Sequence, residues 1–482
     1  MNAKPLLGVV GLAGAAIAAG QLTLANASDV SSKGKTVANV TSTVEGDLDL
    51  NPEGGIPDVI VWEIFGFQNY SQGSMRAYAI GTTSCNTGDV PLAWFSNTNQ
   101  HPVIGQNMFR LAPGANGNPR FEQVGQAWLK HGFCALSQTQ CGPCQATNCN
   151  TLGVGCSDPY SAGLNGSQFD AGPKWQVNAT TGFFPYPPSN PSWNGNVARR
   201  LQVPSSDVQP SQNPGATYFV EAQYVCPDEN PAISITAARN NTSWRQVNLN
   251  FAGSITGYSG STQMEEAAIE AWKNADAEVM LTTVTVPDEG TIYVASRAYD
   301  NGDGTYDYEY AVQNLDVHRS VGTFTVPVAS AADVSGEGFA DVDYHSGEPF
   351  SGTDWASNRA GDELSWATQT FAQNANANAI RWGTLYNFRF TSDAAPADGD
   401  VELGMFRPGA PDAVMAAARV PGDVASNCPA DVDNSGAVDF NDIVSVLSAW
   451  GDCDGCPQDI DNSGAVDFTD LVSLLSSYGP CP

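Results

Sequence analysis

The chain has 482 residues, which is too long for a single hydrophobic core and predicts two or three domains. Its 20 basic and 51 acidic residues give a formal net charge of −31, which excludes nucleic-acid binding and suits calcium or a saline exterior. The 48 Gly and 30 Pro indicate turns and short strands, and hydrophobic residues, at 42%, are sufficient for an extended core.

Residues 1–27 have the features of an export signal. Lys4 supplies a short positive region, residues 6–19 are apolar and small, and an Ala-Asn-Ala cleavage site ends at Ala27. We therefore expect cleavage near Ala27 and a secreted or cell-surface protein. A membrane anchor is the alternative, but the apolar run is short, and no later segment approaches the roughly 20 apolar residues of a spanning helix. Residues 28–54 are rich in Ser, Thr, Gly and Asp, so we expect a flexible segment there.

From about residue 55, short apolar runs are separated by turn residues, a pattern typical of β-strands. The clearest runs are residues 59–67, 76–80, 218–225, 279–286, 292–298, 306–312, 324–328, 380–390 and 401–406. Apolar and polar side chains alternate in residues 306–312, which predicts a half-buried strand. Only residues 264–276 have a convincing helical pattern.

The pattern predicts a mainly β fold with one or two β-sandwich-like domains. We expect a Cys-rich domain over residues 55–276 that ends in the helix, a β-sandwich over 277–408, and a linker over 409–427, which is rich in Ala, Pro, Gly and Asp. The second segment contains Tyr306-Asp-Tyr-Glu-Tyr-Ala-Val-Gln-Asn followed by Phe324-Thr-Val-Pro-Val. In these residues it resembles extracellular sandwich domains that precede C-terminal anchoring modules, a class without assigned chemistry.

Eleven Cys in an exported chain favour disulfides, seven in the body and four after residue 427. Seven is odd, so one body thiol is free, ligates a metal, or pairs between molecules. Cys141 and Cys144 have the CxxC spacing of a redox site, but Cys134, Cys149 and Cys156 lie in the same polar, Gly-containing segment. We expect a disulfide-linked loop, with a redox pair and a zinc knuckle as the alternatives.

Two of the four histidines, His101 and His131, precede or adjoin this loop, and Asp158 follows it. Together they could hold zinc, copper or iron with an open position. No tight spacing such as HxH or HExxH supports this site, so ordinary hydrogen-bonded histidines are the alternative. Glycoside hydrolysis would need two carboxylates across a cleft, and the 51 acidic residues do not single out a pair.

An internal repeat occupies residues 428–482, where the segment that begins at Cys428 recurs 28 residues later from Cys456. Each copy holds a 12-residue loop with Gly at position 6 and oxygen donors at positions 1, 3, 5, 7, 9 and 12. These donors are Asp431, Asp433, Ser435, Ala437, Asp439 and Asp442 in the first copy, and Asp459, Asp461, Ser463, Ala465, Asp467 and Asp470 in the second. The segment has ten Asp and no Lys, Arg, His or Glu, so without a cation its carboxylates would repel one another.

A helix with apolar residues at helical spacing is predicted after each loop. We expect one buried stripe per helix, formed by Phe440, Ile443, Val444, Leu447 and Trp450 in the first and by Phe468, Leu471, Val472, Leu475 and Tyr478 in the second. Cys428 and Cys453 bracket the first copy, and Cys456 and Cys481 bracket the second. So small a core needs covalent support, so we expect one disulfide within each copy.

This segment resembles a dockerin, a small all-α pair of EF-hand loops found at the ends of many exported bacterial proteins. The resemblance implies two calcium ions and a cohesin-like partner or another extracellular protein. Position 12 is Asp, as is normal for dockerins, whereas Phe440-Asn441 and Phe468-Thr469 stand where dockerins commonly contact cohesin. A calcium-stabilised cap without a partner is the alternative reading of this segment.

Three hypotheses follow for the function. The first is a non-catalytic structural, adhesive or surface-displayed protein, attached or assembled through the calcium module. The second is a carbohydrate-active hydrolase or carbohydrate-binding protein that carries a dockerin and acts on a polysaccharide. The third is a metalloenzyme that uses His101 and His131. We favour the first, and a glycoside hydrolase is the enzyme class to expect if the body is catalytic.

Overall fold

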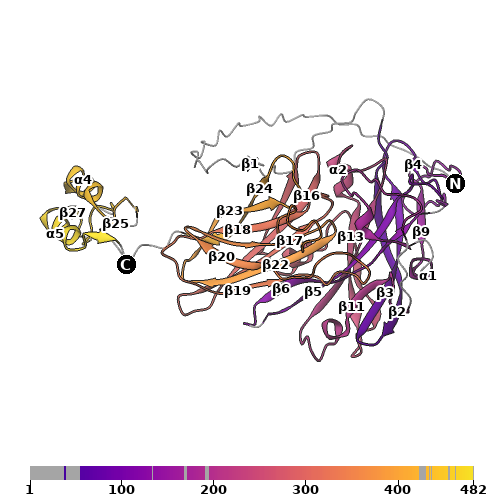
Figure 1. Ribbon diagram of the computed structural model, residues 1–482, viewed down its shortest axis with the longest axis horizontal. Helices are drawn as coiled ribbons and strands as arrows, with labels where there is room; N and C mark the ends of the chain where they lie inside the picture. Colours follow the sequence, from indigo (N-terminus) through magenta and orange to yellow (C-terminus); the bar gives the residue numbers. More distant parts are fainter. Residues whose placement is uncertain are drawn as a thin grey trace, which may run out of the picture. The chain divides into compact units, whose positions relative to one another are not determined.

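The computed structural model describes residues 37–38, 55–114, 116–132, 134–167, 171–189, 195–422, 430–433, 435, 437–453, 456–461 and 463–480. These residues are mainly β (Figure 1), as the apolar runs predict. The expected export signal and nearly all of the expected flexible segment lie outside the described residues. Within the described part of the chain, no helix is both long and apolar enough to cross a membrane.

The N-terminal part of the body is an eleven-stranded, mostly antiparallel sheet with the strand order β14-β13-β12-β5-β6-β11-β3-β2 and three short strands at its side. The strands on this path are β2 (Val59–Gln72), β3 (Met75–Asn86), β5 (Val103–Pro113), β6 (Pro119–Gln126), β11 (Leu201–Pro204), β12 (Thr217–Val225), β13 (Thr242–Leu249) and β14 (Ile255–Gln263). The side strands are β7 (Leu129–His131), β9 (Ser157–Tyr160) and β10 (Ala171–Gly172), and β4 (Leu92–Ala93) pairs separately with β8 (Thr151–Leu152).

The later part of the body is a sandwich of two sheets. The five-stranded sheet contains β15 (Met280–Val286), β16 (Gly290–Asp300), β17 (Tyr306–Asn314), β22 (Thr384–Ser392) and β19 (Val334–Ala340) in this order. The six-stranded sheet contains β1 (Val37–Ala38), β24 (Ala413–Pro421), β23 (Pro396–Met405), β18 (Val321–Pro327), β21 (Glu363–Ala367) and β20 (Ala356–Ala360). The predicted sandwich is therefore present, and all nine predicted apolar runs overlap strands.

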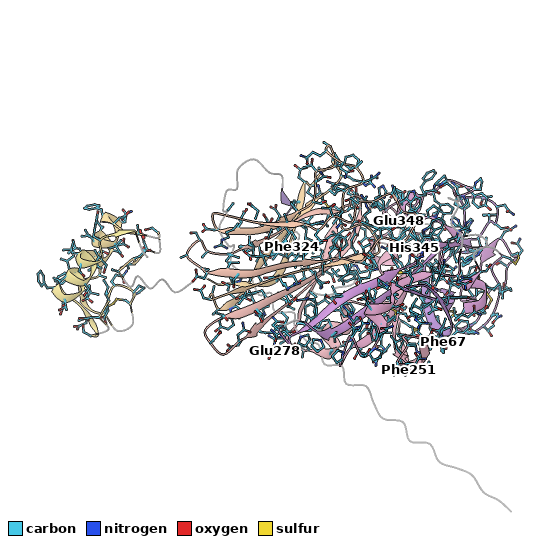
Figure 2. All side chains as sticks on the ribbon, turned by 60° about the horizontal axis from the view of Figure 1, so that its bottom comes forward. Phe67, Phe251, Glu278, Phe324, His345 and Glu348 are labelled. Carbon is cyan, nitrogen blue, oxygen red and sulfur yellow. A yellow bond between two sulfur atoms is a disulfide. The ribbon has the colours of Figure 1, made fainter. Side chains whose placement is uncertain are left out.

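Aromatic side chains fill the space between these two sheets. Phe324 from β18 stacks on Phe388 from β22 with 4.4 Å between ring centroids, and Figure 2 shows Phe324 within the sandwich. Tyr308 and Phe390 stack at 4.9 Å. All four rings are almost completely buried, so the sandwich obtains its stability from apolar burial and ring packing.

The prediction that residues 306–312 form a half-buried strand is wrong, because β17 is covered on both faces. One face lines the sandwich core, and the other packs with Phe109, Phe121 and Trp272 in a second core that the N-terminal sheet shares. Its polar residue Glu309 is 1% exposed and is held by Arg120 of β6, whose Nε donates to Glu309 Oε2 at 2.8 Å. The two sheet systems on either side of residue 276 thus pack into one body.

Two further predictions need correction at their boundaries. The predicted linker over 409–427 contains β24, which is paired along its whole length with β23, because the Ala and Val of residues 413–420 alternate into the core. The predicted helix over 264–276 is reduced to α3 (Glu270–Ala275). Short helical turns in the rest of the body are α1 (Ala162–Gly166), α2 (Ile235–Arg239), η1 (Lys174–Gln176) and η2 (Ser205–Val208).

The Cys-rich segment is a disulfide-linked loop, as predicted. Its three disulfides join Cys85 to Cys141, Cys134 to Cys149, and Cys144 to Cys156. Cys141 and Cys144 therefore belong to different disulfides, so the CxxC redox interpretation and the zinc knuckle lose their thiols. The seventh thiol, Cys226, is free and buried, and burial raises its pKa well above the ordinary value.

The C-terminal module consists of two helices and two short ribbons. The helices are α4 (Phe440–Ser448) and α5 (Phe468–Ser476), and the strands are β25 (Ala437–Val438) paired with β28 (Gly479–Pro480), and β26 (Gly451–Asp452) paired with β27 (Ala465–Val466). A small core links Val438 and Val466 of the ribbons to Val446 and Leu474 of the helices. Each loop of one copy is thereby joined to the end of the other copy.

Candidate functional site

The first C-terminal loop gathers carboxylates at one point. Asp431, Asp433 and Asp442 have carboxylate oxygens that all lie within 4.8 Å of one another. Asp442 is fully buried, and its Oδ1 accepts hydrogen bonds from the backbone N–H groups of two loop residues at 2.8 and 3.1 Å. The Ser435 hydroxyl donates to the Ala437 carbonyl oxygen at 3.0 Å, so the oxygens of positions 5 and 7 are also adjacent.

The second loop repeats this geometry. Asp459, Asp461 and Asp470 form the other group of three carboxylates, and the Ser463 hydroxyl donates to the Ala465 carbonyl oxygen at 3.1 Å. The turn at position 6 needs a left-handed backbone, and Gly464 supplies it with a φ of 92°. Two loops with the same donors at the same spacing therefore fold in the same way.

The remaining predicted ligands, Asp439 and Asp467 at position 9, cap the two helices. Oδ1 of Asp439 accepts from the Asn441 backbone N–H at 2.7 Å, and Asp467 accepts from Thr469 at the same distance. Both lie outside the groups of three converging carboxylates among the described residues. Position 9 of such loops often reaches the cation through water, which is compatible with this placement.

The electrostatics of the second loop keep its deepest carboxylate ionised. Burial acts to raise the pKa of Asp470, but the backbone N–H groups of Asp467, Asp461 and Ile460 outweigh it, and the pKa lies below its ordinary value. A ligand for a cation must be deprotonated, so this arrangement is ready for one. Carboxylates, a hydroxyl and a backbone carbonyl form a hard, all-oxygen donor set, which fits calcium rather than zinc or copper.

The expected buried stripes of the two helices are largely exposed, which corrects the sequence interpretation. Phe440 is 66% exposed and Phe468 is 69% exposed. We define the apolar stripe of α4 as Phe440, Val444, Leu447 and Trp450, and that of α5 as Phe468, Val472, Leu475 and Tyr478; all eight side chains are exposed. The core is instead formed by Ile443 and Val446 in α4, and by their equivalents in α5. In so small a module, each helix is covered on one face only, by the other helix and the ribbons, and its other face stays exposed.

The disulfide pattern of the module also differs from the prediction. Cys453 pairs with Cys456, so the end of the first copy is joined to the start of the second. The predicted bonds from Cys453 to Cys428 and from Cys456 to Cys481 are therefore wrong. The pairing of β26 with β27 continues into a hydrogen bond from the Cys453 backbone N–H to the Gly464 carbonyl at 3.0 Å. The Cα atoms of Cys453 and Cys456 are 5.8 Å apart, which is within the range of a disulfide. Cys428 and Cys481 lie outside the described residues.

In the body, the structure brings His101 and His131 together. His101 Nδ1 lies 3.2 Å from the Phe95 carbonyl oxygen, and His101 Nε2 lies 3.0 Å from His131 Nδ1. A carbonyl only accepts, so His101 donates from Nδ1 and accepts from His131 at Nε2. Both rings are buried beside Phe184 and Tyr186. Burial, together with the neighbouring His101 and Lys130, lowers the pKa of His131 to about 3, so the pair is neutral.

The third predicted member, Asp158, does not join the two histidines. In the described part of the chain, the only groups of three converging His, Cys, Asp or Glu side chains are the two Asp groups of the C-terminal module. Asp158 instead accepts from the Leu136 backbone N–H at 3.1 Å, and burial raises its pKa to about 6. The geometry thus matches the alternative of hydrogen-bonded core histidines.

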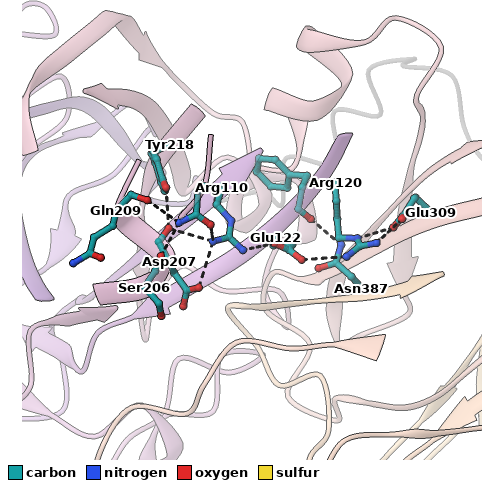
Figure 3. Close-up of polar contacts among 11 residues, drawn as sticks. Arg110, Arg120, Glu122, Ser206, Asp207, Gln209, Tyr218, Glu309 and Asn387 are labelled. Atoms are coloured by element: carbon teal, nitrogen blue, oxygen red, sulfur yellow. Dashed lines mark hydrogen bonds and ion pairs between the residues drawn. The ribbon is translucent and has the colours of Figure 1, made fainter. Parts of the chain in front are cut away.

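A polar cleft lined by several carboxylates lies between the N-terminal sheet and the sandwich, and Figure 3 shows the polar contacts around Arg110 at this place. Glu122 and Asp207 line it, and both are bound by Arg110, at 2.7 Å and 3.3 Å respectively. Asp341, with a pKa that burial raises to about 6, accepts from the Asn378 amide. Glu122, Asp207 and Asp341 are thus held by ion pairs or hydrogen bonds, and Asp343 is a fourth carboxylate in the lining.

Comparison with known proteins yields little. No protein-family model and no curated protein matches the chain. Among solved structures, a partial N-terminal region of an enterococcal surface protein covers 78% of this chain and 98% of its own, at 9% identity and a TM-score of 0.15. The B domain of a biofilm-associated protein is 7% identical over 74% of this chain and 86% of its own, with a TM-score of 0.13. The BSP domain of a biofilm-associated protein is 6% identical over 79% of this chain and 62% of its own, also at 0.13. Scores this low carry no argument about fold or function.

Proposed function

We propose that this chain is an exported, non-catalytic structural or adhesive protein that is attached to a partner through a calcium-dependent C-terminal module. The observation that carries the proposal is the combination, in one small module, of two convergent Asp groups and two exposed apolar stripes. The first feature suits a hard cation, and the second suits a protein partner.

Each loop would hold one calcium ion through the same donor set. In the first loop these donors are Asp431, Asp433, Ser435, the Ala437 carbonyl and Asp442, with Asp439 acting through water. The module carries ten Asp and no basic residue, so binding of two divalent cations removes a repulsion that its small core cannot offset alone. Calcium would therefore order the loops and fix the orientation of the helices that follow them.

The two apolar stripes would form the docking surface. Phe440, Trp450, Phe468 and Tyr478 are large aromatic side chains at least half exposed, and aromatic residues dominate the energetics of protein interfaces. The repeat presents the same kind of surface twice, once on α4 and once on α5. A cohesin-like partner, or another extracellular protein with a complementary apolar surface, could occupy either stripe.

The body supports a structural role outside the cell. Its sandwich is packed with aromatic rings, three disulfides tie its Cys-rich loop, and its two sheet systems share a core. Disulfides persist in oxidising compartments, which agrees with export. Three carboxylates of the polar cleft, those of Glu122, Asp207 and Asp341, are held in ion pairs or hydrogen bonds, which suits a structural role for this cleft.

The proposal is tested by the fraction of the protein that stays bound to the producing cells. The full chain is compared with the double variant Asp442→Asn/Asp470→Asn, with Phe440→Ala/Phe468→Ala, and with the control Asp452→Asn, which removes an exposed carboxylate outside the loop donors and the apolar stripes, each with and without a calcium chelator. We expect chelator and the Asp variant to release the protein, and the Phe variant to release it while still binding calcium. The control should stay bound. Attachment that survives both chelator and the Asp variant would refute the calcium-dependent module.

A further inference from the structure

A narrow cavity lies inside the body, between the N-terminal part and the sandwich. Gln126 and Lys174 line it from one side, and Glu348, Arg381 and Arg407 line it from the other. Aromatic side chains of Trp175, Trp382, Tyr344 and Phe350 complete its wall. Its volume is about 20 Å³, which is room for one or two waters or a single small ion.

The charge of the lining is opposite to that of the protein. Three basic side chains, Lys174, Arg381 and Arg407, face one carboxylate, Glu348, whereas the chain as a whole carries a net charge of −31. Burial lowers the pKa of the neighbouring His318 to about 4, and the positive charges of Arg407 and Arg381 act in the same direction. This cavity is therefore a positively charged interior site in a strongly acidic protein.

Arg381 is the side chain whose hydrogen bonding is incomplete. It is 6% exposed, and its Nη2 donates to the Ala377 carbonyl at 2.9 Å and to the Ala375 carbonyl at 3.2 Å. Its Nε and Nη1 are buried without any hydrogen-bond partner among the described residues. The Tyr344 hydroxyl interacts with the guanidinium and also bonds to the Ala379 carbonyl at 3.0 Å, and the centre of the Phe350 ring lies 3.6 Å from the guanidinium carbon. Buried donors of a charged group that lack an acceptor are costly, so they point to an absent acceptor.

Lys174 supplies a second positive charge to the lining. It is buried, its Nζ donates to the Gln126 side-chain oxygen at 3.0 Å and to the Gly383 carbonyl at 2.9 Å, and it lies 5.2 Å from the centre of the Trp382 ring. An ammonium group has three N–H donors, so one remains for a ligand. Glu348 is directed elsewhere in part, because its Oε2 accepts from the His345 backbone N–H at 3.1 Å; both residues are labelled in Figure 2.

We propose that this cavity binds one small monovalent anion of halide size, held by Nε and Nη1 of Arg381 and by Lys174. The size of the cavity excludes a sugar or a nucleotide and favours a halide over a larger oxyanion, and three basic side chains against one carboxylate leave an excess of two positive charges in the lining. The ion connects η1 of the N-terminal part to the segment before β22 of the sandwich. The bound ion would therefore stabilise the contact between the two parts of the body, independently of the calcium module.

The test is the unfolding temperature of the body in sodium chloride and in sodium gluconate at equal ionic strength and equal calcium. Gluconate is too large for the cavity. At chloride concentrations about ten times the dissociation constant, we expect the body transition to rise by about 2 °C relative to gluconate. The chloride effect should vanish in Arg381→Met and persist in the control Arg419→Met, because the Arg419 side chain does not line the cavity, is 40% exposed and pairs with Asp398.

A second measurement does not depend on any variant. Crystals of the wild-type mature chain soaked in bromide should show one anomalous peak in the cavity, within hydrogen-bond distance of Arg381. An unfolding temperature that is the same in chloride and gluconate, together with a cavity that contains water and no bromide, would overturn the proposal. If Arg381→Met does not fold, the wild-type salt comparison and the bromide peak still decide the question.

Discussion

The body and the C-terminal module use the same kinds of residues in opposite ways. In the body, aromatic rings such as Tyr308, Phe324 and Phe388 are buried between sheets, whereas Phe440 and Phe468 of the module are mostly exposed. The body can bury its rings because its two sheets cover a large common area. The described part of the module has only two helices and two ribbons, so we propose that its loops depend on a bound cation for their order. Aromatic residues therefore stabilise the first region, and in the second we propose that they bind a partner.

The largest effect should come from the centre of the sandwich. Phe388→Ala removes a fully buried ring that stacks on Phe324 at 4.4 Å, and we expect a loss of about 3–5 kcal/mol in the free energy of unfolding of the body. Urea unfolding followed by Trp fluorescence measures it. A loss below about 1 kcal/mol would show that the sandwich core can collapse around the vacated space, and it would weaken the contrast between the two regions.

The next largest effect should arise where the two sheet systems meet. Glu309→Gln removes the charge that Arg120 faces in a buried pair, and we expect a loss of about 3 kcal/mol because the guanidinium stays buried. The matched control is Asp398→Asn, which breaks the exposed pair with Arg419 and should change stability by about 0.5 kcal/mol or less. Equal effects of the two substitutions would contradict the buried junction.

Removal of calcium should destabilise the C-terminal module and leave the stability of the body unchanged. At a free calcium concentration about 100 times the dissociation constant, each bound ion stabilises the module by about 2.7 kcal/mol. Differential scanning calorimetry with calcium and with chelator should therefore move only the transition of the module. A body transition that moves by the same amount as that of the module would show that calcium also binds elsewhere in the chain.

We expect the neutral His101–His131 pair to make the free energy of unfolding of the body depend on pH. The folded pKa of His131 is about 3, so below the ordinary value of about 6.5 the unfolded chain takes up a proton that the folded chain does not. Stability from this residue is complete above about pH 6.5 and falls between there and pH 3, with a loss of roughly 2 kcal/mol at pH 5. His131→Asn keeps an N–H donor toward His101 and should lose this part of the pH dependence. Parallel stability curves for the two proteins would contradict the neutral, buried pair.

The smallest effect on stability should be found on the docking surface. Phe440→Ala removes a ring that is 66% exposed, so the free energy of unfolding should change by about 0.5 kcal/mol or less. Val446→Ala, at a fully buried position of the same helix, should cost about 2 kcal/mol and serves as the comparison. If Phe440→Ala is the more destabilising of the two, this ring belongs to the core, as the sequence pattern suggested.

The sequence carried much of the fold because strand patterning is local. The runs of residues 59–67 and 218–225 lie in β2 and β12, and the repeat gave the two loops with their donors. The features that could not be predicted from the sequence depend on contacts between residues that are distant in the chain. From the sequence alone, Glu309 is expected to face solvent, whereas in the structure it is buried beside Arg120. Arg381 and Lys174 line the same cavity only because the two parts of the body pack together. The exposed stripes share the spacing of a buried face, because periodicity defines a face and not what covers it.

The most direct test of the central claim is a calorimetric titration of the metal-free mature protein with calcium. The account predicts two equivalents of calcium for the wild type and one for Asp442→Asn, with the remaining site in the loop of Asp459, Asp461 and Asp470. Absence of calcium binding by the wild-type protein, or an unchanged two equivalents in the variant, would contradict the account.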